Sequence, residues 1–131
     1  IHAFGARSFS IRDGLTGDLV YDSGNDFERI TAGRYGALFN SNHEEFGGDT
    51  RSDDKGPEPE ALTLGVIRGA TFAFIGLERI GGVMVYDVTD PARASYVTYL
   101  NTRTGAAGAT ATGAGAAGRS SVTRRMRSGL S

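Results

Sequence analysis

The residues best suited to chemistry lie in one acidic loop. Seven of the 15 acidic residues fall between Glu44 and Glu60, where only Arg51 and Lys55 oppose them. Hard cations such as Ca²⁺ take about six to eight oxygen ligands, often carboxylates on one tight loop. The spacing is not that of an EF-hand, so a solvated loop with a few ion pairs is the competing interpretation. The candidate metal ligands are Asp53, Asp54, Glu58 and Glu60.

Two further charged residues stand where a strand is expected to end. Glu78 and Arg79 follow an apolar run and precede the pair Gly81-Gly82, which suits a tight turn. Charged residues in such a position are candidates for contacting a ligand, and the alternative is an ion pair that pins the turn. Pro57 and Pro59 favour extended backbone, which predicts that Glu58 and Glu60 project to the same side.

No catalytic residues can be assigned from the sequence. Asp22-Ser23-Gly24 superficially suggests an activated serine, but no partner base stands at a recognisable spacing and no G-x-S-x-G motif is present. The chain has no cysteine and two histidines, of which His43 lies in the acidic loop. Thiolate zinc sites and disulfides are therefore excluded, and His43 is either a further metal ligand or an exposed side chain.

The elements that would position these residues are short strands. Alternating apolar residues and turn signals predict an all-β fold, in which four strands within about 40 residues match one blade of a β-propeller. The aromatic residues on these strands are expected in the core. The predicted strands are 7–13, 19–22, 61–67, 71–78, 83–88 and 95–100.

An insertion separates the two strand units. Within residues 23–60, apolar residues at helical spacing predict one short helix in 25–40. The polar remainder of the insertion is the acidic loop.

The runs SFSIRDGLTGDLVYDSG, FNSNHE, RSDDKGPEPEALTLG and TFAFIGLERIGGVMVYDVTDP resemble the choice-of-anchor I family. The resemblance implies an exported β-propeller, extracellular or anchored to a bacterial envelope, and often labelled alkaline phosphatase-like. Residues 1–100 would then be a partial propeller: 8–22 the end of one blade, 23–60 the inserted helix and acidic loop, and 61–100 one blade.

Residues 101–131 differ in character from the rest. All 15 acidic residues lie in 1–100 with nine of the 14 basic ones, and the other five, all arginine, lie in 101–131. This Gly/Ala/Arg-rich segment has too little apolar surface to offset chain entropy, so it is expected to be a disordered tail produced by a frameshift or truncation. It contains a formal G-x-G-x-x-G but lacks the flanking strand and helix that a dinucleotide site needs. It also lacks the interleaved aromatics of a nucleic-acid binder.

Two functions from different classes remain open. The first is a surface binding module that recognises a protein, a glycan or another envelope component. The second is a Ca²⁺-dependent hydrolase of phosphate esters, with the acidic loop holding the ion. The sequence shows no nucleophile and base together, which favours the binding module, and no apolar run reaches the roughly 20 residues that span a bilayer.

Overall fold

The computed structural model describes residues 7–44 and 47–103. A hairpin of β1 (Ser10–Arg12) and β2 (Leu19–Asp22) comes first, then helix α1 (Asp26–Tyr35) and the short 3-10 helix η1 (Gly36–Leu38). A four-stranded antiparallel sheet follows in the order β3-β4-β5-β6, with the short 3-10 helix η2 between its last two strands. Its elements are β3 (Pro59–Ile67), β4 (Ala70–Leu77), β5 (Val83–Asp87), η2 (Pro91–Arg93) and β6 (Ser95–Leu100).

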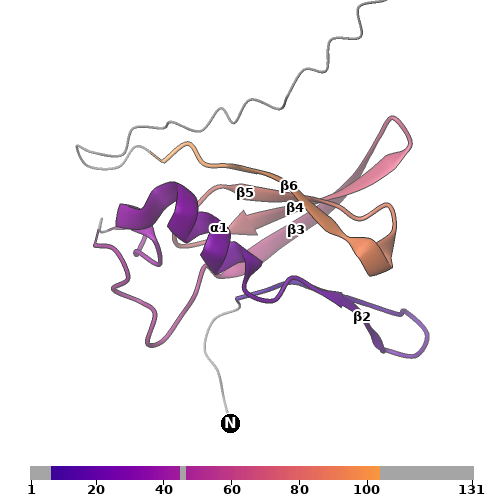
Figure 1. The fold of residues 1–131 in the computed structure, drawn as a ribbon, viewed down its shortest axis with the longest axis horizontal. Helices are drawn as coiled ribbons and strands as arrows, with labels where there is room; N and C mark the ends of the chain where they lie inside the picture. The colour runs from indigo at the N-terminus through magenta and orange to yellow at the C-terminus, as the bar shows by residue number, and fades with distance from the viewer. Residues whose placement is uncertain (1–6, 45–46, 104–131) are drawn as a thin grey trace, which may run out of the picture.

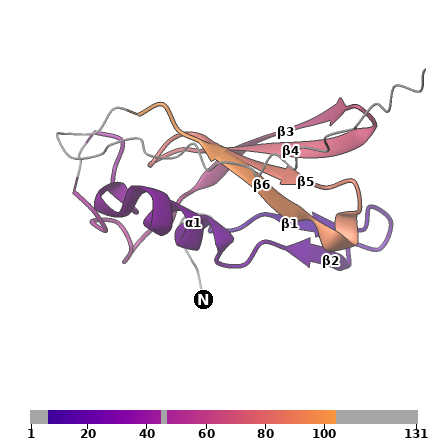
Figure 2. The ribbon, with the colours of Figure 1, turned by 45° about the horizontal axis from the view of Figure 1, so that its top comes forward.

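The molecule has two layers. Figure 2 shows the four-stranded sheet on one side, with α1 and the β1–β2 hairpin side by side against it. Phe27 and Ile30 from α1 and Leu38 from η1 supply the apolar side chains of the second layer. They pack on a row of sheet residues that are all buried: Ala73, Ile75, Leu77, Met84, Tyr86 and Tyr99.

Aromatic contacts join the hairpin to the sheet. The ring of Phe9 lies 4.9 Å from that of Tyr86 in an edge-on geometry and 6.0 Å from that of Phe27 in a stacked one. Such pairs add to the stabilisation from area burial. The Tyr86 hydroxyl donates to Asp26 Oδ2 at 3.1 Å, which ties the start of α1 to the middle of the sheet.

Most of the predicted elements are confirmed. The strands 19–22 and 95–100 have the predicted bounds, the other strands agree within three residues at each end, and the helix lies inside 25–40. The mostly-β class is confirmed, with two antiparallel sheets and a helix. The predicted disorder of 101–131 falls, apart from residues 101–103, outside the described residues.

The expectation that all the strand aromatics form the core was wrong for two of them. Cross-strand pairing puts Phe74 opposite Val85 and Phe72 opposite Asp87, on the face of the sheet away from α1. Both phenylalanines are only partly buried. The alternation gave the strand correctly, but it could not show that both faces of β4 carry large apolar residues.

Candidate functional site

Glu58 is the centre of the acidic loop. Its side chain is 2 % exposed, although it is an ionisable residue in a loop of a small protein. The backbone at Glu58 is left-handed, with φ of 52°, so the prediction of extended chain between Pro57 and Pro59 was wrong here. The carbonyl oxygen of Glu58 accepts from the amide of Glu78 at 2.9 Å. This bond and the ion pairs of the side chain hold a conformation that costs roughly 1–3 kcal/mol for a residue other than glycine.

Two cations neutralise the buried carboxylate. Arg79 Nε lies 2.7 Å from one oxygen of Glu58, and Lys55 Nζ lies 3.2 Å from the other. Burial raises the pKa of Glu58, but hydrogen bonds from Arg79 and Lys55 and their positive charges outweigh it, so the pKa lies below its ordinary value. Glu58 is therefore ionised at neutral pH and fully paired, as a buried charge must be.

Two more acidic side chains lie close to the Arg79–Glu58 pair. Arg79 Nε lies 3.1 Å from Glu78 Oε2. Carboxylate oxygens of Glu58, Glu60 and Glu78 all lie within 4.8 Å of one another, which is close enough for one ion to contact all three. Three carboxylates face two cations at this point, and the structure thus joins two predicted metal ligands with both predicted ligand-contacting residues.

The other two predicted metal ligands lie elsewhere in the loop. Asp53 and Asp54 are exposed in the turn that follows Arg51, whose carbonyl oxygen accepts from the Asp54 amide at 3.1 Å. In the described part of the chain, neither belongs to the group of carboxylates that one ion could contact. Of the interpretations left open above, the geometry shows the ion pair between the acidic loop and Arg79 directly.

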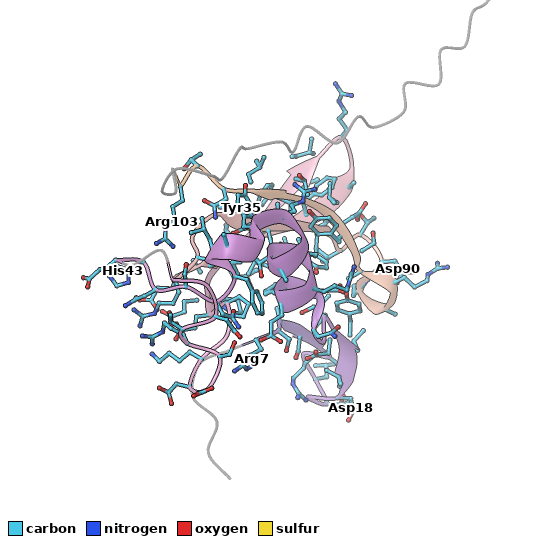
Figure 3. All side chains as sticks on the ribbon, turned by 60° about the vertical axis from the view of Figure 1, so that its left-hand side comes forward. Arg7, Asp18, Tyr35, His43, Asp90 and Arg103 are labelled. Carbon is cyan, nitrogen blue, oxygen red and sulfur yellow. The ribbon has the colours of Figure 1, made fainter. Side chains whose placement is uncertain are left out.

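The segment around His43 is held close to Arg79 as well. Arg79 Nη1 lies 3.2 Å from His43 Nδ1, and His43 Nε2 lies 3.4 Å from Glu44. Arg103 donates to the carbonyl oxygens of Asn42 and His43 at 2.7 and 3.1 Å and to that of Arg79 at 3.1 Å. Figure 3 shows Arg103 and His43 on the same side of the molecule, beyond the end of α1.

Two arginines in this network had no sequence signal. Arg103 was assigned to the tail, yet it joins the loop to the β4–β5 turn. Arg7 pairs with Glu28 and donates to the carbonyl oxygen of Ser52 at 2.8 Å, so it fastens the acidic loop to α1. The contacts of both arginines join residues more than 20 positions apart in the sequence, so no local pattern indicates them.

Ser23 has a structural role in this fold. It is buried, and its hydroxyl oxygen accepts from the Phe9 amide at 3.0 Å. The Ser23 amide in turn donates to the Phe9 carbonyl at 3.0 Å. This pair of bonds closes the open end of the β1–β2 hairpin.

The fold and this site define a small mostly-β protein in which ion pairs join the loop before β3 to the turn after β4. Residues 1–91 match the family model described as Choice-of-anchor I domain, so the chain belongs to the choice-of-anchor I family. Membership of this family indicates a surface-associated domain.

One curated relative is Gigasin-3a of Magallana gigas, which is 35% identical over 91 residues. The match covers 66% of this chain and 32% of the relative, so the chain spans about a third of that protein's length. No solved structure gives a significant match. Within the described residues, no helix is long and apolar enough to cross a membrane.

Proposed function

We propose that this chain is part of an exported, envelope-anchored β-propeller that acts as a binding module at the cell surface. Family membership supports the surface location. In the proposal, β3–β6 is one blade, β1–β2 is the end of the blade before it, and residues 23–60 are an insertion between them. The binding partner is a protein, a glycan or another component of the envelope.

The observation that carries this proposal is a sheet with apolar side chains on both faces. One face bears the core under α1 and the hairpin. The opposite face carries Phe72, Phe74, Val83 and Leu100, of which Val83 and Leu100 are exposed. An antiparallel sheet that meets water on one face shows polar residues there. A sheet that is apolar on both faces needs cover on both, as a propeller blade has between its two neighbours.

The position of the hairpin supports the same arrangement. Phe9, which leads into β1, packs on Tyr86 in the centre of the sheet. The β1–β2 hairpin therefore lies face to face with β3–β6 rather than joining its edge. Two sheets stacked in this way are the contact that adjacent blades make.

A second candidate function rests on the three carboxylates at Glu58. A Ca²⁺-dependent hydrolase of phosphate esters would hold its ion between Glu58, Glu60 and Glu78. Arg79 would have to leave Glu58 first, because its Nε occupies an oxygen that the ion would need. The pairing of Glu58 with two cations makes the binding module the better supported of the two.

Two measurements on the full-length protein test these proposals. Protease treatment of intact cells, with antibody detection of the β3–β6 region, removes the signal if the protein is surface-displayed and leaves it if the protein is internal. Calorimetric Ca²⁺ titration and a phosphate-ester assay test the hydrolase, with Glu60→Gln as the variant and the exposed Asp53→Asn as its matched control. If the parent protein and Asp53→Asn both release heat on Ca²⁺ binding and hydrolyse the ester, and Glu60→Gln does neither, the hydrolase is established in place of the binding module.

A further inference from the structure

We draw no further inference here: the strongest candidate, the exposed apolar patch of Leu62, Leu64 and Val66 on the β3–β4 hairpin that projects beyond β5 and β6 (Figure 1), continues the core face of the sheet, and nothing in the described residues shows what covers it.

Discussion

Replacing Glu58 by glutamine tests the energetics of the loop most informatively. The carboxylate is almost completely buried and is contacted by Arg79 Nε at 2.7 Å and Lys55 Nζ at 3.2 Å. Removing one partner of a fully buried pair costs about 3–5 kcal/mol. The cost is smaller here, because Arg79 keeps Glu78 at 3.1 Å and the glutamine carbonyl oxygen still accepts a hydrogen bond.

We therefore expect Glu58→Gln to lower the free energy of unfolding by about 2 kcal/mol at pH 7. For a domain of this size, each kcal/mol shifts Tm by about 4–8 °C, so the melting temperature should fall by about 8–16 °C. Thermal and urea unfolding followed by circular dichroism would measure both quantities. Asp54→Asn, an exposed position in the same loop, is the control and should stay within about 0.5 kcal/mol of the parent.

The pH dependence gives an independent check. The positive charges and hydrogen bonds of Arg79 and Lys55 lower the pKa of Glu58 in the folded protein below its ordinary value of 4.5. A lowered pKa stabilises the fold above the unfolded value, and this contribution is lost as the pH falls through the folded value. The difference between parent and Glu58→Gln should thus be full at pH 7 and shrink below about pH 4.5. Equal stability at pH 7, or a difference that does not change with acid, would refute the reasoning.

Three further predictions concern the frame around the loop. Tyr86→Phe removes the hydrogen bond to Asp26 and should cost about 1 kcal/mol in urea unfolding; an unchanged midpoint would contradict the role of that bond. Gly82→Ala places a Cβ 2.5 Å from the Leu100 carbonyl oxygen at a φ of 84°, so the free energy of unfolding should fall by about 2 kcal/mol or more. A variant as stable as the parent would contradict this close approach between the turn and Leu100. Burial raises the pKa of Tyr86 and of Tyr99, so spectrophotometric titration should show both phenols protonated until the protein unfolds in alkali, and early ionisation of all tyrosines would contradict their burial.

The strands were predictable from sequence because their signals are local. A glycine-containing turn before it predicted 19–22, and alternation after the loop with Pro91 predicted 95–100, both with their observed bounds. The helix followed from apolar spacing, and Phe27 and Ile30 are its buried apolar residues, beside the buried Thr31. Each of these features depends on neighbours within a few residues along the chain.

The site was predictable in composition but not in arrangement. The sequence indicated Glu58, Glu60, Glu78 and Arg79, and the fold brings all four together. It did not indicate the left-handed backbone of Glu58, which depends on a hydrogen bond from Glu78 twenty residues later. The role of Arg103 was hidden for the same reason, since its partners lie about 24 and 61 residues away in the chain.

We propose that both faces of the β3–β6 sheet are covered in the full-length protein, and cysteine labelling measures that cover. The chain has no cysteine, so Thr63→Cys introduces a single thiol on the face away from α1, opposite Phe74. Leu15→Cys provides an exposed reference. We expect fast maleimide labelling of both variants in the 131-residue chain, and protection of Thr63→Cys alone in the full-length protein. Equally fast labelling of Thr63→Cys in both proteins would contradict this proposal.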